Sequence, residues 1–381
     1  MARLDEIFDL QMGKTPSRNN ADYWTDGQYD WVSIADLGSY QKYVEDTKER
    51  ISALAVQESG IKSVPANTVI MSFKLSLGKT AITQEPVYTN EAIMAFIPTG
   101  KYAVLPDYFY YLFSAKDWTK GTNRAVMGTT LNKATLGAVS ITVPPIDEQH
   151  KIAAVLDKVS DLIAKRRQQL GKLDEMVKAR FVEMFGDPVG NPMGWEKIAL
   201  GKRCDIVTGN TPSRADPENY GNFIEWIKSD NINTPAVLLT EAQEYLSETG
   251  FHKCRFVEAG SLLMTCIAGS INCIGNVAVT DRRVAFNQQI NAIVPKQDDV
   301  LYLYWLMLLS KPAIHSTINM ALKGILSKGQ LSEMAFPFPP LELQNQFSVF
   351  VKKTEKTKAN INRSLEKLET LKKALMQEYF G

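Results

Sequence analysis

The chain has 381 residues, of which 45% are hydrophobic and 22% charged, and its formal net charge is +1. This length favours two domains over one, and the near-neutral charge excludes a protein that binds nucleic acid through a uniformly basic surface. Four Cys without a CxxC pair, with only three His, exclude the usual zinc spacing. No segment resembles a signal peptide or a membrane span, so we expect a reduced, cytoplasmic protein that does not contact a membrane.

The first informative segment in chain order is the loop Gly13-Lys14-Thr15-Pro16-Ser17-Arg18. Its Lys, Thr, Ser and Arg side chains have the chemistry that contacts DNA phosphates and base edges. A Pro-stiffened turn with solvated charges is the alternative interpretation. After this loop, residues 1–145 alternate short apolar runs with turns. They predict strands at 68–73, 93–97 and 139–143 and a helix at 106–114.

A long helix is predicted over residues 146–186, directly after Pro144-Pro145. At 1.5 Å per residue it would be about 60 Å long. Its apolar residues recur with the heptad spacing of a helix that packs along one seam against another helix. The seam residues are Ile152, Leu156, Val159, Ile163, Leu170, Leu173 and Val177. The Gly- and Pro-rich residues 187–195 predict a linker after the helix.

The second half of the chain repeats the first half at an offset of 193 to 197 residues. Gly209-Asn210-Thr211-Pro212-Ser213-Arg214 matches the first loop, and Pro339-Pro340 matches the Pro pair before the long helix. Residues 196–340 therefore form a second domain, with strands at 261–266, 290–294 and 334–338 and a helix at 300–309. Residues 341–381 form a second long helix, with seam residues Ile361, Leu365, Leu368 and Leu375.

These repeats predict an α+β protein with two tandem domains of mixed α/β structure, each followed by a long helix. Two helices of equal length can bury their apolar stripes against each other, so we expect an antiparallel coiled coil within the chain. Burial of each stripe in the core of its own domain is the alternative.

Catalytic motifs are missing from both halves. The segment Gly78-Lys79-Thr80 lacks the Gly that a P-loop needs five residues earlier, where Phe73 stands. The Pro-Pro pairs follow Val143 and Phe338, whereas an adenine methyltransferase needs Asn or Asp before the two Pro. The sequence therefore predicts a binding protein without metal or cofactor.

Two similar modules separated by a stiff rod suit a DNA target in two parts, because recognition surfaces on one duplex must be held at a fixed separation. The candidate DNA-binding residues lie in three loops that recur while their side chains differ. In the first domain they are Lys14, Thr15, Ser17, Arg18, Lys74, Lys79, Arg124 and Lys133. In the second they are Asn210, Thr211, Ser213, Arg214, Ser270, Lys323 and Lys328, and Lys228 is a further candidate outside these loops.

The combined pattern resembles the specificity (S) subunit of type I restriction-modification enzymes over essentially the full length. The resemblance rests on the repeated Gly-x-Thr-Pro-Ser loops, on the helix starts Pro144–Gln149 and Pro339–Gln344, and on Phe185-Gly186-Asp187-Pro188 with Gly194-Trp195. The first half departs from the pattern because it has no counterpart of Gly194-Trp195.

The resemblance implies that each domain is a target-recognition domain that reads one half of a bipartite DNA site. The two helices would set the spacer and dock two methyltransferase (M) subunits, which carry S-adenosylmethionine. Restriction (R) subunits would use ATP and Mg, and this chain would bind no cofactor and catalyse no reaction. A stand-alone DNA-binding protein and a single-chain DNA methyltransferase or nuclease with a fused recognition module are the alternatives, and a coiled-coil scaffold that binds no nucleic acid is a third.

Overall fold

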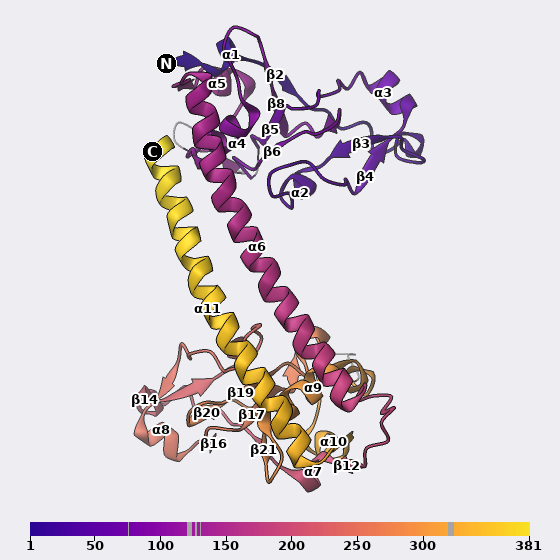
Figure 1. Ribbon diagram of the computed structural model, residues 1–381, viewed down its shortest axis with the longest axis vertical. Helices are drawn as coiled ribbons and strands as arrows, with labels where there is room; N and C mark the ends of the chain where they lie inside the picture. Colours follow the sequence, from indigo (N-terminus) through magenta and orange to yellow (C-terminus); the bar gives the residue numbers. More distant parts are fainter. Residues whose placement is uncertain (75, 120–123, 126–127, 130, 319–323) are drawn as a thin grey trace. The chain divides into compact units, whose positions relative to one another are not determined.

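The computed structural model describes residues 1–74, 76–119, 124–125, 128–129, 131–318 and 324–381 (Figure 1). The chain forms two compact units. The first unit comprises Met1–Arg167 and Arg363–Gly381, and the second comprises Gln168–Asn362. Each unit therefore contains one repeated globular part and a portion of both long helices.

The described part of the first unit contains short strands and helices that lead into the first long helix. In chain order they are β1 (Ala2–Arg3), α1 (Leu4–Ile7), β2 (Phe8–Met12), η1 (Ala21–Tyr23), β3 (Tyr29–Val32), α2 (Ile34–Leu37), β4 (Glu49–Ile51), α3 (Ala53–Ser59), β5 (Val69–Ser72), β6 (Thr80–Ile82), β7 (Tyr88–Thr89), β8 (Ile93–Pro98), α4 (Pro106–Ala115), β9 (Arg124–Ala125), β10 (Gly128–Thr129), α5 (Lys133–Gly137), β11 (Ser140–Ile141) and α6 (Ile146–Phe185). The strands predicted at 68–73, 93–97 and 139–143 are β5, β8 and β11, and the predicted helix at 106–114 is α4.

The second half of the chain repeats this series of elements. They are β12 (Lys197–Ala199), α7 (Leu200–Arg203), β13 (Cys204–Thr208), η2 (Pro217–Asn219), β14 (Tyr220–Ile227), η3 (Ser229–Asn231), β15 (Tyr245–Leu246), α8 (Glu248–His252), β16 (Phe256–Val257), β17 (Leu262–Thr265), β18 (Ile267–Ala268), η4 (Ile271–Cys273), β19 (Val277–Val279), β20 (Val284–Phe286), β21 (Ile290–Pro295), α9 (Val300–Ser316), β22 (Gly324–Ile325), α10 (Lys328–Glu333), β23 (Ala335–Pro337) and α11 (Leu341–Phe380). The predicted strands are confirmed as β17, β21 and β23.

The main sheet has the same topology in both units. Its strand order is β2-β8-β5-β6 in the first unit and β13-β21-β17-β19 in the second, with antiparallel neighbours throughout. A second sheet follows, β4-β3-β7 in the first unit and β15-β14-β20-β16 in the second, and each contains one parallel pair. The pairs β1-β11 and β12-β23 also correspond. The prediction of two repeated domains of mixed α/β structure is therefore confirmed.

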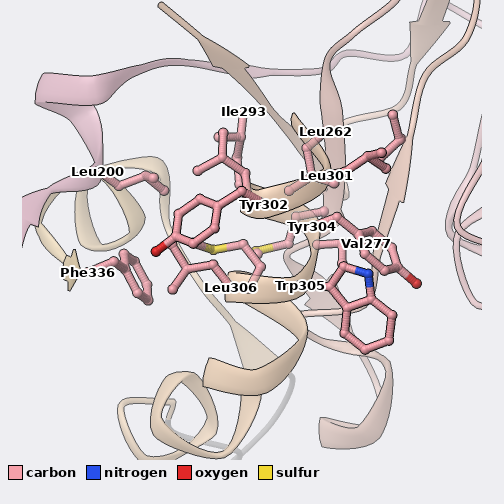
Figure 2. Packing of buried hydrophobic residues seen from close by; sticks show 14 of the residues in the cluster. Leu200, Leu262, Val277, Ile293, Leu301, Tyr302, Tyr304, Trp305, Leu306 and Phe336 are labelled. Atoms are coloured by element: carbon pink, nitrogen blue, oxygen red, sulfur yellow. The ribbon is translucent and has the colours of Figure 1, made fainter. Parts of the chain in front are cut away.

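Helix α9 packs one face onto the main sheet of the second unit. Tyr302 and Leu306 lie among Leu262, Ile293 and Leu200 in the core, and Tyr302 and Leu306 are both 0% exposed (Figure 2). The predicted end of this helix at residue 309 was wrong, because α9 continues to Ser316 through Pro312. Pro usually ends a helix, but burial of Ile314 against the same core outweighs the missing hydrogen bond here.

Both long helices begin directly after a Pro-Pro pair and end directly before a Gly, as predicted. Within the first unit, Arg167 of α6 donates to Glu369 of α11 at 2.7 Å, and within the second, Lys358 donates to Asp174 at 2.7 Å. Within the second unit Phe181 of α6 also contacts Phe347 of α11, further along α6 and earlier in α11 than the Asp174–Lys358 pair, so the portions of the two helices in this unit run antiparallel.

The apolar stripes of these helices contribute to the domain cores as well as to the helix pair. Ile152 and Leu156 belong to the core of the first unit, and Val177 belongs to that of the second. Of the predicted seam residues, Ile152, Leu156, Val159, Ile163 and Val177 are buried, whereas Leu170, Leu173, Ile361, Leu365, Leu368 and Leu375 are half-buried. Part of the apolar stripe is therefore buried in the cores of the units, the alternative that the sequence left open, and the coiled coil stays a prediction.

Aromatic residues pack the C-terminal end of each long helix against the core of one unit. Phe181 and Phe185 of α6 contact Phe347 and Tyr302 in the second unit, with ring centroids 5.0 to 5.6 Å apart. In the first unit, Phe380 of α11 lies 5.5 Å from Tyr108. Phe181 and Phe185 are among the largest buried side chains, and the heptad pattern did not single them out.

A buried Gln ties the start of each long helix to its domain. Gln149 accepts from the N–H of Leu105 at 2.9 Å and donates to the carbonyl oxygens of Ala103 and Pro144. Gln344 accepts from the N–H of Asp299 at 3.0 Å and donates to Asp298 and to the Pro339 carbonyl. Both are 0% exposed, so their amides satisfy backbone groups that water cannot reach.

Candidate nucleic-acid interface

The two Gly-x-Thr-Pro-Ser-Arg segments, here called the TPS loops (residues 13–18 and 209–214), occupy equivalent places after β2 and β13. The N–H of Gly13 donates to Ile93 at 3.1 Å, and the N–H of Gly209 donates to Ile290 at 3.0 Å. Trp31 Nε1 closes the first loop by donating to the Lys14 carbonyl. Each TPS loop is therefore held by backbone contacts and a buried Trp, and the two loops differ only in the residue after the Gly, Lys14 or Asn210.

Substituting Ala for Gly13 should destabilise the first unit by about 2 kcal/mol, because an added Cβ would lie 2.3 Å from the carbonyl oxygens of Thr89 and Asn90. Gly209→Ala should do the same in the second unit, where a Cβ would lie 2.2 Å from the Asn287 oxygen. Thermal unfolding measures the effect. Gly171→Ala is the matched control, since nothing lies within 4 Å of its Cβ and Ala favours the helix. An unfolding midpoint unchanged by all three substitutions would contradict the expectation.

The Arg that ends each TPS loop is held by an acid and by aromatic rings. The guanidinium of Arg18 makes two hydrogen bonds to the Glu49 carboxylate, one of them 2.9 Å long, and lies 3.7 Å from the ring centroid of Trp24. The hydrogen bond with Glu49 raises the pKa of Arg18, and the same bond lowers the pKa of Glu49. The side chain of Arg18 is still 48% exposed. A cation is thus fixed at the surface and remains accessible.

The second unit repeats this arrangement with one additional cation. Arg214 donates to Glu244 at 2.8 Å and lies 5.5 Å from the Trp226 ring, and Lys228 binds the other oxygen of the same carboxylate. Lys228, followed by Arg214, lowers the pKa of Glu244. The sequence alone did not identify Glu49 or Glu244, because each lies about 30 residues from its Arg.

A short turn, which we call the central turn, connects the candidate loops in each unit. It comprises residues 90–92 in the first unit and 287–289 in the second. Thr15 donates its hydroxyl to Glu91, and Thr211 donates to Gln288. This turn belongs to a segment that recurs in the two halves, residues 90–98 and 287–295, but the sequence did not propose it as a site.

The loop after β5 or β17 meets the other side of the central turn. In the first unit, the N–H of Phe73 donates to Ala92 at 3.0 Å, and in the second, the N–H of Cys266 donates to Gln289 at 2.8 Å. The carbonyl oxygens of Phe73 and Cys266 in turn accept hydrogen bonds from the N–H groups of Leu131 and Leu326. In both units the TPS loop, the central turn and the loop after the strand therefore form one contiguous edge.

The loop after the strand differs between the two units. Its described residues are 73–74 and 76–79 in the first unit, and in the second it comprises residues 266–276. Helix α9 holds the longer loop, because Lys311 Nζ donates to the Asn272 carbonyl at 2.7 Å and His315 Nε2 lies 2.8 Å from the Ile274 carbonyl. The two edges thus share a framework and differ in shape.

Several predicted residues lie on or beside these edges. Ser17, Lys79, Ser213, Thr211 and Ser270 are exposed. Lys14 is exposed and donates to the Ser59 carbonyl, and Lys74 lies 5.2 Å from the Phe73 ring centroid. Asn210 is used structurally, because its amide bonds the backbone of Lys253 and Arg255 at 2.9 and 2.8 Å.

Of the remaining predicted residues, Lys133 lies away from the TPS loop. Lys133 lines a hollow with Asp5, Asp9 and Thr99 beside the start of β2, whereas the TPS loop follows the end of that strand. Lys328 is exposed as the first residue of α10. The side chain of Arg124 and the whole of Lys323 lie outside the described residues.

Within the described ranges, no group of three or more His, Cys, Asp or Glu side chains is arranged to hold a metal ion. Across the same part of the chain, no helix combines the length and the apolar character that crossing a membrane requires. The edges described above offer hydrogen-bonding and cationic groups on rigid loops, which suit recognition of a polar, anionic surface.

Comparison with known proteins identifies the family. The family model of the type I restriction modification DNA specificity domain matches residues 1–172 and 192–370. The chain belongs to this family. Its two matched segments correspond to the two halves of the internal repeat.

Individual specificity proteins support the same assignment. The MjaIX specificity subunit of a type I restriction enzyme from Methanocaldococcus jannaschii is 30% identical over 232 residues, which cover 56% of this chain and 53% of that protein. In that alignment the chain spans about half the length of its relative.

Two solved structures share the fold. One chain, from a structure of the type I R-M system that concerns complex assembly and conformational transition, has a TM-score of 0.63 at 17% identity, with 100% of this chain and 96% of that chain covered. The S subunit from M. genitalium has a TM-score of 0.59 at 13% identity, with coverage of 100% and 95%.

Proposed function

We propose that the chain is the DNA-specificity subunit of a type I restriction-modification enzyme, in which each unit reads one half of a bipartite DNA site. The observation that carries this proposal is the duplicated edge. The same backbone contacts hold a TPS loop, a central turn and the loop after β5 or β17 in both units, while side chains differ at Lys14 and Asn210, at Glu91 and Gln288, and along the loop after the strand. Two units that read different half-sites require different side chains on the same backbone framework.

The two long helices set the spacing between the half-sites in this proposal. The pairs Arg167–Glu369 in the first unit and Asp174–Lys358 in the second support pairing of the two helices as a coiled coil. A helix pair is stiff along its axis, so its length would fix the number of base pairs between the two half-sites.

The helix pair also offers apolar surface for partner subunits. Val155, Leu162 and Leu371 are 40 to 46% exposed in the first unit, and Val349 is 67% exposed in the second. A groove of about 610 Å³ in the second unit is lined by Met176, Ala179, Arg180, Glu183 and Phe350. We assign these exposed apolar side chains and the groove to contacts with two methyltransferase (M) subunits.

The chemistry belongs to the partner subunits in this proposal. The M subunits would bind S-adenosylmethionine and methylate adenine, and restriction (R) subunits would use ATP and Mg to translocate and cleave DNA. This chain would supply sequence recognition and assembly without a cofactor of its own.

Sequencing of methylated sites tests the proposed function. The chain is expressed in cells together with its M subunit, and the methylated positions in the DNA are mapped. We expect one asymmetric sequence with two specific parts and a fixed spacer of unspecified bases. A methylation pattern without two specific parts would refute the proposal.

Calorimetry distinguishes the proposed specificity subunit from a single-chain methyltransferase. Such an enzyme would bind S-adenosylmethionine by itself, whereas we expect no heat of binding from the purified chain. A stand-alone DNA-binding protein would bind its site tightly without any M subunit, so a gel-shift titration with and without that subunit distinguishes it.

Substituting Ala for Arg18 or Arg214 should weaken DNA binding by the assembled complex, because each side chain places a fixed cation at the recognition edge. If the guanidinium meets a phosphate, the slope of log K against log salt should fall by about 1 per substitution. Arg3→Ala and Arg283→Ala are matched controls, since both remove an Arg that pairs with an acid elsewhere in the same units. Equal affinity and equal slope for all four variants would remove the TPS loops from the interface.

A further inference from the structure

Glu91 and Gln288 are the exposed residues of the two central turns, and they occupy the same place in the two units. Each follows an Asn that begins the turn, and in each unit the oxygen of the side chain accepts a hydrogen bond from the Thr of the TPS loop. The backbone around them also matches, because Asn90 N–H donates to Val32 and Asn287 N–H donates to Ile227, both at 3.0 Å. The two side chains have nearly the same shape and are placed by the same contacts.

The two side chains differ in hydrogen-bonding capacity. An ionised carboxylate only accepts hydrogen bonds, whereas a carboxamide both accepts and donates. Thr15 and Thr211 each occupy one acceptor site, so Glu91 still presents acceptors alone, and Gln288 still presents an NH₂ group beside its oxygen. On base edges, a carboxylate accepts from the cytosine amino group, and Gln pairs with adenine through one donor and one acceptor.

We propose that Glu91 and Gln288 read equivalent base positions in the two half-sites. The two half-sites then differ in the base at this position, because Glu91 carries a carboxylate and Gln288 a carboxamide. Glu91 selects a base that presents an amino group, and Gln288 selects adenine. This inference rests on the proposed function, since it assumes that each unit faces one half-site.

Electrostatics support a reading role for Glu91. An exposed carboxylate at a DNA-binding edge is repelled by phosphates, so it belongs there only where it meets a hydrogen-bond donor. The guanidinium of Arg18 reduces that repulsion, because it lies near Glu91. The hydrogen bond with Glu49 is the largest cause of the raised pKa of Arg18, and the negative charge of Glu91 also raises it. Arg18 can therefore face the backbone of the DNA while Glu91 faces a base.

The competing explanation is a purely structural role, in which Glu91 only holds the TPS loop in place by accepting the hydrogen bond from Thr15. The chain contains its own control for this role, because Gln288 holds Thr211 with an amide oxygen in the same geometry. Glu91→Gln should therefore preserve the pinning contact and change only the group that faces the DNA. Gln288→Glu is the reciprocal change.

The experiment compares the full chain, its E91Q and Q288E variants and an E85Q control, each expressed with the M subunit. Glu85 is exposed in the first unit, and its substitution removes the same charge without touching the central turn. Methylated sites are mapped by sequencing, and binding of the purified complexes to the wild-type site is measured at one salt concentration. Thermal unfolding of each variant checks that its fold is intact.

We expect E91Q to change the preferred base at one position of one half-site and Q288E to change one position of the other half-site, with the spacer unchanged. Discrimination at the altered position should shift on the order of 10- to 100-fold, the range of a bidentate side-chain–base contact. E85Q should methylate the wild-type sites, and all variants should unfold at the wild-type temperature.

Two results would overturn the inference while leaving the proposed function intact. One is that E91Q and Q288E methylate the same sequence as the wild type. The other is that they lose methylation or unfold early without acquiring a new preferred base, which would assign the pair to a structural role. If the wild-type complex itself shows no bipartite sequence, the proposed function fails instead, so the two failures are distinguishable.

Discussion

Replacing Gln344 by Leu should lower the free energy of unfolding of the second unit by about 3 kcal/mol. The amide of Gln344 is the hydrogen-bond partner of the Asp299 N–H and of the Pro339 carbonyl, and it also bonds Asp298. Leu fills the same volume but leaves two buried backbone groups unpaired, each of which costs about 1–3 kcal/mol. Chemical denaturation measures the loss, and hydrogen exchange at the Asp299 amide locates it at the start of α9.

Gln346→Leu is the matched control for this substitution. Gln346 is exposed two residues further along the same helix, so its replacement should change stability by less than about 0.5 kcal/mol. Gln149→Leu should repeat the large effect in the first unit, because its amide bonds Leu105, Ala103 and Pro144 in the same way. If Gln344→Leu were as mild as the control, water or a rearranged backbone would have to satisfy these groups, and the Gln would not anchor the helix.

Lengthening both long helices by four residues should change the spacer of the recognised DNA site while leaving both half-sites intact. The insertions belong after Leu170 in α6 and after Arg363 in α11, which lie in sequence between the pairs Arg167–Glu369 and Asp174–Lys358. Four helical residues add about 6 Å, and base pairs rise by about 3.4 Å, so the spacer should grow by roughly one or two base pairs. Sequencing of methylated sites gives the new spacer directly.

The control for the helix insertion places four Gly and Ser residues in the linker at 187–195. This segment contains no regular helix or strand, so the insertion should leave the spacer unchanged. An unaltered spacer after the paired helix insertions, with both half-sites still methylated, would show that the helices do not measure the site.

Much of the architecture could be predicted from the sequence because it depends on local patterns. The Pro-Pro pairs cannot lie inside a helix, so both long helices begin where expected, and Gly186, which has a positive φ, ends the first of them. The internal repeat predicted two domains of the same kind, and the main sheets confirm it. Helix α9 is the exception, since its buried face carries it past Pro312, where a local pattern would end it.

The candidate edges were predictable only in part. The TPS loops stand out because they recur, but the partners that shape them are distant in sequence. Arg18 meets Glu49, and the loop after β5 meets Ala92. The sequence also proposed Lys133, which lies beside the start of β2 rather than with the TPS loop. Residue type alone cannot distinguish a Lys on the recognition edge from a Lys on another face.

The sequence by itself determined the duplication, the two long helices and the lack of a catalytic motif, because repetition, heptad spacing and motif spacing are properties of the chain. Only the tertiary structure decided which residues meet around the central turns. The antiparallel sheet brings the end of β2 beside the start of β8, and thereby places Thr15 against Glu91. That contact joins residues 76 positions apart, and no local pattern specifies it, because it depends on strand register.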